Sequence, residues 1–177
     1  MAQKATIFKA ELAVADMDRG HFATYTLTLA RHPSETDERM MVRVLAYALN
    51  ADERLEFGPG LSAEGEADLV KTDLTGAIDL WIDVGLPEER EVRKAAGRAE
   101  RVAVYVYGRG AEPWWKHNQG ALERLGNLRV VALPESDTQA LAAMVSRSMQ
   151  LACTIQEGHL WVTCAGETLQ IEPTALK

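Results

Sequence analysis

The chain has 177 residues, of which 47% are hydrophobic and 25% are charged. A chain of this length can bury a substantial core without disulfides or structural metals, so residues 1–177 are predicted to form one globular domain. The formal net charge of −7 argues against tight, non-specific nucleic-acid binding over the whole surface. No apolar run approaches the roughly 20 residues of a membrane span, and we expect a cytoplasmic protein without membrane association.

The first part of the chain predicts a hairpin followed by a helix. Residues 6–14 and 21–31 alternate apolar and polar side chains on either side of a polar turn, a pattern typical of paired strands. Ser34 then fits the N-cap of a helix of about four turns, with Asp37 completing a variant of the capping box. We expect this helix to end near Asn50.

One acid of this helix is directed toward its apolar side. At about 100° per residue, a single stripe is formed by Met41, Val42, Leu45, Ala48 and Leu49. Glu38 lies at the centre of the stripe, and Glu35 lies nearer its edge. Acids in a first turn also interact favourably with the helix N-terminus, so each carboxylate has two interpretations, a helix-stabilising group or part of a site.

Residues 64–85 predict a second hairpin, which turns around residues 73–76. In its second strand one face carries Ile78, Leu80, Ile82 and Val84, and the other carries Asp79, Trp81 and Asp83. The first face belongs to the core. Asp is depleted in strands, so the acids of the second face either contact water or hold a ligand. Pairing about Gly76 would also bring Asp68 close to Asp83.

The next segment predicts a helix with Pro87 at its first position. Its small side chains form a packing face, whereas its basic side chains form a stripe of Arg90, Arg93, Lys94, Arg98 and Arg101. Residues 102–108 predict an apolar strand at the centre of a sheet. Two more helices, over 112–126 and from Ser136, a strand over 128–133 and a closing meander of strands complete the pattern of a compact α/β domain with a mixed β-sheet.

The two cysteines lie in strand-like runs that flank a turn at Glu157 and Gly158. If Ile155 pairs with Leu160, both thiols point to the apolar face. We interpret Cys153 and Cys164 as small buried side chains in a reducing compartment rather than as a disulfide or a redox pair.

Several segments, in order and spacing, resemble the YaeQ family: HPSETDERMMVRVLAYAL, GAIDLWIDVGLPEER, KAAGRAERVAVYVYG and WWKHNQ. The similarity extends from KATIFKAEL to the terminal strands. It implies a compact α/β fold built around a variant of the PD-(D/E)XK nuclease core. Enzymes with that core hold Mg²⁺ with a helix Glu and two strand carboxylates, and a nearby Lys helps to activate water for attack on a phosphodiester.

The resemblance implies a site composed of Glu38 from the helix and Asp83 from the strand, with Asp68 or Asp79 as the third metal ligand. The usual signature has a Lys two residues after the strand acid, but this chain has Gly85 there. Lys94 on the following helix is the candidate substitute, which makes Glu38, Asp79, Asp83 and Lys94 the candidate catalytic set. Arg90, Arg93 and Arg98 are the candidate substrate-binding residues.

The role of Asp79 remains open at this stage. Four residues of regular strand separate Asp79 from Asp83 by about 13 Å, too far for one ion. Either a bulge bends the strand, or Asp79 contacts a metal ligand or the substrate rather than the metal, or both acids belong to the solvated face of an edge hairpin. His32, just before the helix, is a reserve general acid or base.

Three functional hypotheses follow. The first is a Mg²⁺-dependent nuclease or related phosphodiester hydrolase. The second is a nuclease-fold protein without catalysis that binds nucleic acid or a protein, which the missing Lys favours. The third is a small interaction module with a solvated acidic face, which the net charge favours.

Overall fold

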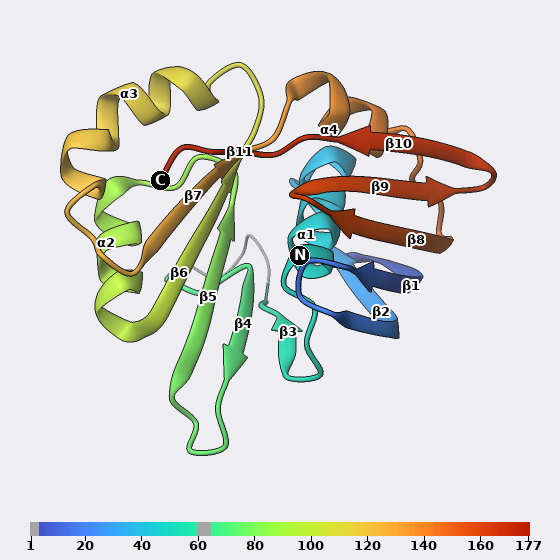
Figure 1. Cartoon of the computed structure of the whole chain (residues 1–177), viewed down its shortest axis with the longest axis horizontal. Helices are drawn as coiled ribbons and strands as arrows, with labels where there is room; N and C mark the ends of the chain where they lie inside the picture. The colour runs from blue at the N-terminus through green and yellow to red at the C-terminus, as the bar shows by residue number, and fades with distance from the viewer. Residues whose placement is uncertain (1–3, 60–64) are drawn as a thin grey trace.

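The chain folds into two mixed β-sheets with helix α1 between them (Figure 1). The structure, a computed structural model, describes residues 4–59 and 65–177. The first sheet has the strand order β10-β9-β8-β1-β2, and the second has the order β11-β7-β6-β5-β4-β3. The predicted α/β class with mixed pairing is confirmed, although the strands form two sheets rather than one.

The first sheet joins the N-terminal hairpin to three strands from the last third of the chain. Its strands are β1 (Thr6–Asp16), β2 (His21–Arg31), β8 (Ser148–Gln156), β9 (His159–Cys164) and β10 (Glu167–Ile171). The β1–β2 hairpin is antiparallel, as predicted, whereas β1 and β8 are parallel. Ile155 pairs with Leu160, and both cysteines are buried free thiols, which confirms the predicted pairing and the buried, unbridged state of the two side chains.

The second sheet contains the predicted 64–85 hairpin, of which residue 64 lies outside the described residues. Its strands are β3 (Leu55–Phe57), β4 (Leu69–Thr72), β5 (Ile78–Val84), β6 (Ala99–Val106), β7 (Leu128–Ala132) and β11 (Thr174–Ala175). Strands β5, β6 and β7 are parallel, with β6 in the middle as expected. The turn is stabilised by Asp73, whose Oδ1 accepts hydrogen bonds from the backbone N–H groups of Thr75 and Ala77.

Four helices are described: α1 (Asp37–Leu49), α2 (Glu89–Arg98), α3 (Ala111–Leu122) and α4 (Glu135–Ala142). Helix α1 contacts both sheets and α4, while α2 and α3 pack together on the opposite side of the second sheet (Figure 1). The two buried clusters of the core follow this division, one around α1 and one under α2 and α3. Both faces of β5 are therefore covered, and Trp81 is only 5% exposed. The alternative in which one face of β5 is wholly solvated is therefore wrong.

Two predicted helix starts are also wrong. The N-cap of α1 is Thr36, whose hydroxyl accepts a hydrogen bond from the Arg39 backbone N–H, because the chain first makes a turn in which the Glu35 N–H bonds to the carbonyl of His32. Ser34 lies within that turn. In α2 the N-cap is Glu88 and the helix begins at Glu89, so Pro87 precedes the helix instead of occupying its first position.

Candidate functional site

The buried acid near the start of α1 is Glu35, not Glu38. Glu35 is 4% exposed, and its Oε1 accepts a hydrogen bond of 2.6 Å from Nη2 of Arg43, which is itself 1% exposed. Its Oε2 accepts from Nη1 of Arg39 at 2.7 Å and from Nε of Arg43 at 3.1 Å. Because the helix begins at Asp37, Glu35 lies before it, and its direction is set by the preceding turn.

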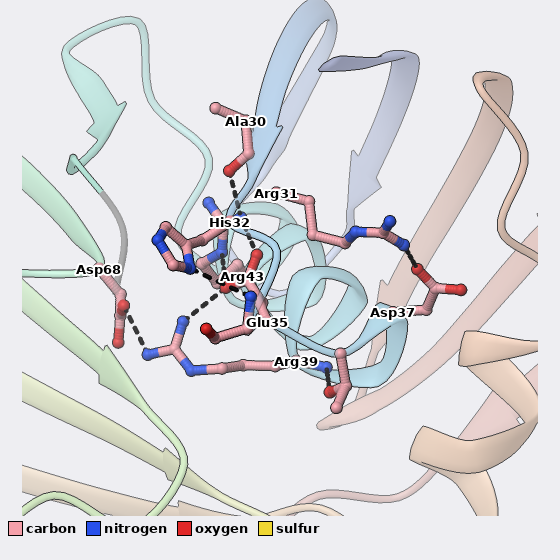
Figure 2. A network of polar contacts seen from close by, with 10 residues as sticks. Ala30, Arg31, His32, Glu35, Asp37, Arg39, Arg43 and Asp68 are labelled. Carbon is pink, nitrogen blue, oxygen red and sulfur yellow. Dashed lines mark hydrogen bonds and ion pairs between the residues drawn. The ribbon is translucent and has the colours of Figure 1, made fainter. Parts of the chain in front are cut away.

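Arg39 connects Glu35 to the second sheet. Figure 2 shows the Arg39 side chain extending between the two carboxylates, and its Nη2 donates to Oδ1 of Asp68 at 2.8 Å. The other oxygen of Asp68 accepts the backbone N–H of Val84 at 2.8 Å. Asp68 thus joins the start of β4, the end of β5 and the N-terminal turn of α1. We call the residues Glu35, Arg39, Arg43 and Asp68 the carboxylate–arginine network.

Asp83 lies beside this network. The pairing of Leu69 with Ile82 places Asp68 next to Asp83, as the hairpin register predicts. Burial, together with the charge of Asp68, raises the pKa of Asp83 from 3.8 to about 6. The indole Nε1 of Trp81 donates to Oδ2 of Asp83 at 3.0 Å, which limits the increase. Within residues 4–59 and 65–177 no ion pair neutralises Asp83 directly.

Tyr107, directly after β6, is a neighbour that sequence reasoning missed. Burial raises its pKa to about 12, and it also experiences the charges of Arg39, Glu38, Glu35 and Asp68. Its phenol therefore stays protonated at neutral pH. Its position at the carboxyl end of a predicted central strand could have identified Tyr107 as a candidate site residue, because α/β sheets commonly bind ligands there.

Glu38 lies on the α4 side of α1. It is partly exposed, and burial together with the charge of Glu135, the first residue of α4, raises its pKa. In the described part of the chain no hydrogen bond joins Glu38 to Asp68 or Asp83. The structure therefore brings Glu35, rather than Glu38, into contact with the groups that reach the strand acids.

Asp79 is held away from Asp83 by other partners. Its Oδ1 and Oδ2 accept hydrogen bonds from Nη2 of Arg101 at 3.1 and 3.2 Å, and its Oδ2 pairs with Nζ of Lys71 at 3.3 Å. Burial acts to raise its pKa, but the bonds and charges of Arg101 and Lys71 hold the pKa below the ordinary value. Its contacts are those of an ion-paired strand residue.

The predicted basic stripe is only partly correct, because Arg101 lies in β6 and pairs with Asp79, whereas three of the basic residues of α2 pair with acids of the same helix. Lys94 is 61% exposed and pairs with Glu91 at 3.3 Å, so its ammonium is directed to that acid rather than to either strand acid. Arg93 pairs with Glu89 at 3.4 Å, and Arg90 with Glu91 at 3.6 Å. Arg98 lies next to the site, since its guanidinium is 5.0 Å from the ring centre of Trp81. Trp81, Lys94 and Arg98 border a cavity of about 390 Å³.

The expected Mg²⁺ site can be compared with the side chains that the structure places near one another. Among the described residues no group of three or more His, Cys, Asp or Glu side chains is arranged around an ion position. His32 contributes no ligand to such a group, and its Nδ1 accepts the backbone N–H of Ser34 at 3.1 Å. Two adjacent carboxylates, Asp68 and Asp83, are nevertheless hard oxygen donors. They fit a water-rich Mg²⁺ site, because Mg²⁺ commonly keeps several waters and takes one or two carboxylates.

Comparison with other proteins gives the family. The sequence model of the family described as YaeQ protein matches residues 1–173. The chain belongs to the YaeQ family. YaeQ proteins of Salmonella typhi and Escherichia coli K12, both described as "Uncharacterized protein YaeQ", are 48% and 46% identical to it, each over 99% of this chain and 97% of the relative.

Solved YaeQ structures share the whole fold. The crystal structure of YaeQ from Xanthomonas axonopodis pv. citri is similar with a TM-score of 0.95 and 48% identity, covering 98% of each chain. YaeQ from Pseudomonas syringae has the same TM-score at 35% identity, covering 99% of this chain and 98% of its own. In the described part of this chain, no helix combines the length and apolar character that crossing a membrane requires.

Proposed function

We propose that this YaeQ-family protein is a Mg²⁺-dependent phosphodiester hydrolase whose core is related to the PD-(D/E)XK nucleases. The observation that carries the proposal is Asp83, a largely buried carboxylate without a direct ion-pair partner in the described residues, beside the carboxylate of Asp68. Two neighbouring carboxylates repel each other, and a divalent cation relieves that repulsion. Strongly perturbed acids of this kind are concentrated at functional sites.

In this proposal Asp68 and Asp83 hold the metal, and Glu35 replaces Glu38 as the helix acid. The metal, when bound, would lower the pKa of a bound water and offset charge at phosphorus. Arg39 fixes the orientation of Asp68 through the 2.8 Å hydrogen bond and keeps the adjacent Glu35 neutralised. Tyr107, whose phenol burial keeps protonated at neutral pH and whose pKa responds to Arg39, Glu38, Glu35 and Asp68, is a candidate hydrogen-bond donor to the substrate.

In the usual signature the cation of the site is a Lys. In this proposal Arg39, rather than Lys94, takes that role. Arg39 is 16% exposed and in contact with Asp68, whereas Lys94 pairs with Glu91 on the helix surface. A guanidinium cannot act as a base at neutral pH, so its contribution is to stabilise charge and to hold Asp68. The substrate backbone would approach along Arg98 and the exposed Arg90 and Arg93 of α2.

Calorimetry with MgCl₂ and MnCl₂, followed by cleavage assays on supercoiled DNA, linear DNA and RNA, tests the proposal. We expect the wild type to bind metal and to cleave at least one substrate. Asp83→Asn should lose both properties, while Lys94→Ala is the matched control and should retain metal binding and most of the rate. If the wild type binds metal no better than Asp83→Asn and cleaves none of the three substrates, the hydrolase proposal is wrong.

A second candidate function is a nuclease-fold protein that binds nucleic acid or a protein without catalysis. The specific observation in its favour is that two arginines already neutralise Glu35 and Asp68, so these acids have less need of a metal. This candidate predicts oligonucleotide binding without metal and without cleavage. The first candidate predicts that metal strengthens binding and that cleavage follows.

A further inference from the structure

A second cavity, of about 340 Å³, opens between the two sheets and is distinct from the acid pair. Its walls come from the first sheet at Asp16 and Ile155, from the second sheet at Tyr105 and Val131, and from α1 at Leu49. Arg19 and Arg129 also line it. A volume of this size lies at the lower end of the range for small-molecule sites, which runs from about 300 to 1,000 Å³.

The cavity contains a buried donor whose proton has no acceptor. Tyr105 is 2% exposed, and its hydroxyl oxygen accepts a hydrogen bond of 2.8 Å from Nδ2 of Asn50. Within the described ranges, no protein acceptor receives the O–H of Tyr105 itself. Burial raises the pKa of this phenol, so the proton is retained at physiological pH. Buried donors normally have a partner, and one that lines a cavity suggests that a ligand supplies it.

Two guanidinium groups lie close enough to influence the Tyr105 hydroxyl. The positive charges of Arg129 and Arg19 both act to lower the pKa of Tyr105, against the larger effect of burial. Arg129 is exposed and makes no ion pair with any residue in the described part of the chain. Arg19 donates from Nε to Asp16 at 2.7 Å and from Nη1 to the carbonyl of Ala51 at 3.1 Å.

The acids of the cavity, in contrast, already have donors. Asp16 accepts the backbone N–H of Arg19 at 3.0 Å in addition to its Nε. The two oxygens of Asp18 accept the backbone N–H groups of Glu157 and Gly158 at 2.7 and 2.9 Å. The lining groups that could still donate to a ligand are the hydroxyl of Tyr105 and the solvated guanidinium of Arg129, neither of which donates to another described residue, and their natural partner is an anionic acceptor.

We propose that this cavity binds a small organic anion, with its carboxylate or phosphate group between Arg129 and Tyr105. The apolar side chains of Leu49, Val131 and Ile155 would contact the body of the ligand. The site is separate from Asp68 and Asp83 and requires neither a metal nor the hydrolase proposal.

Titration with phenyl phosphate and with benzoate in metal-free buffer tests this site, read by calorimetry and by NMR of the arginine side-chain N–H groups. We expect at least one of these anions to bind and to shift the Arg129 signal, while neutral phenol binds much more weakly. Arg129→Ala should weaken binding about tenfold or more, as loss of a charged hydrogen bond does. Tyr105→Phe should weaken it about fivefold, in line with a neutral hydrogen bond.

Two variants serve as controls. Arg90→Ala removes an equally exposed charge on α2, and Asp83→Asn alters the acid pair. Neither should change the affinity for the anion. The proposal is overturned if neither anion binds, if phenol binds as well as phenyl phosphate, or if Arg129→Ala retains wild-type affinity. Because Arg129 is exposed and forms no ion pair with described residues, its removal leaves the folded core intact and the result interpretable.

Discussion

Arg39 donates a hydrogen bond from Nη2 to Oδ1 of Asp68 over 2.8 Å, although 29 residues separate the two in the sequence. The same guanidinium donates to Glu35, so one cation links a turn before α1 to the first residues of the β4–β5 hairpin. This contact fixes the carboxylate that lies next to Asp83. The stability and the proposed chemistry of the site consequently depend on the same arginine.

Arg39→Met should destabilise the fold by about 3 kcal/mol, because it leaves the buried acids Glu35 and Asp68 without one of their cations. Urea unfolding monitored by circular dichroism measures this change. Arg93→Met is the matched control, since its ion pair with Glu89 is on the surface, and we expect a change within about 0.5 kcal/mol. Equal effects of the two variants would contradict a structural role for the bridge.

Glu35 and Glu38 should respond oppositely to the same substitution. Glu35→Gln removes the charge that neutralises Arg43, which is 1% exposed, and we expect a loss of about 3 kcal/mol in the free energy of unfolding. Glu38→Gln relieves repulsion from Glu135 and should leave stability unchanged or slightly higher. Thermal unfolding of both variants at pH 7 decides which acid is structural. A larger loss for Glu38→Gln would show that the assignment is reversed.

Asp83→Asn should stabilise the protein near neutral pH. The pKa of Asp83 is about 6 in the folded state and 3.8 ordinarily, so the folded state binds more protons between these values. Wild-type stability therefore falls as pH rises through this window, by roughly 3 kcal/mol in total. The variant lacks this titration, and its advantage should grow from pH 4 to pH 6 and then level off. Urea unfolding across that range provides the measurement, and a constant difference would contradict it.

Trp81→Phe should raise the pKa of Asp83 further, because the indole N–H stabilises the ionised carboxylate. A hydrogen bond to a charged group contributes about 1.5 kcal/mol or more, so the increase should be about one pH unit. Carbon-13 NMR of the Asp carboxyl groups follows this titration. Trp161→Phe on β9 is the control and should leave the pKa of Asp83 where it is. An unchanged or lower pKa of Asp83 in Trp81→Phe would contradict this role of the indole.

The basic stripe of α2 should affect nucleic-acid binding only through salt-sensitive contacts. Replacing Arg90, Arg93 and Lys94 together by Ala should weaken oligonucleotide binding and reduce the slope of log affinity against log salt by about two to three. Fluorescence anisotropy over a salt series measures both quantities. If the slope is unchanged, the ion pairs with Glu89 and Glu91 account for the stripe, and it has no role in binding.

The sequence by itself determined the features that depend on neighbouring residues. Alternation identified β5 and the shared face of Leu80, Ile82 and Val84, and the turn from Asp73 to Gly76 predicted the hairpin. The register that sets Asp68 beside Asp83 also depends on a β-bulge or irregularity between Lys71 and Thr72. Apolar composition predicted that β6 lies at the centre of a sheet. These follow from side-chain direction and turn geometry, which act over a few residues.

Only the tertiary structure decided which acid near the start of α1 contacts Arg39 and Arg43 and how many sheets the protein has. Helical periodicity centred the apolar stripe on Glu38, but the more buried acid is Glu35, whose orientation depends on Arg43 and Arg39. The chain divides into two sheets because β8 returns to pair with β1. Lys94 pairs with Glu91 on the surface of α2 and does not take the place of the missing Lys. Such contacts join residues that are far apart in the chain. Local sequence patterns do not indicate which oppositely charged side chain or which neighbouring strand will be the partner.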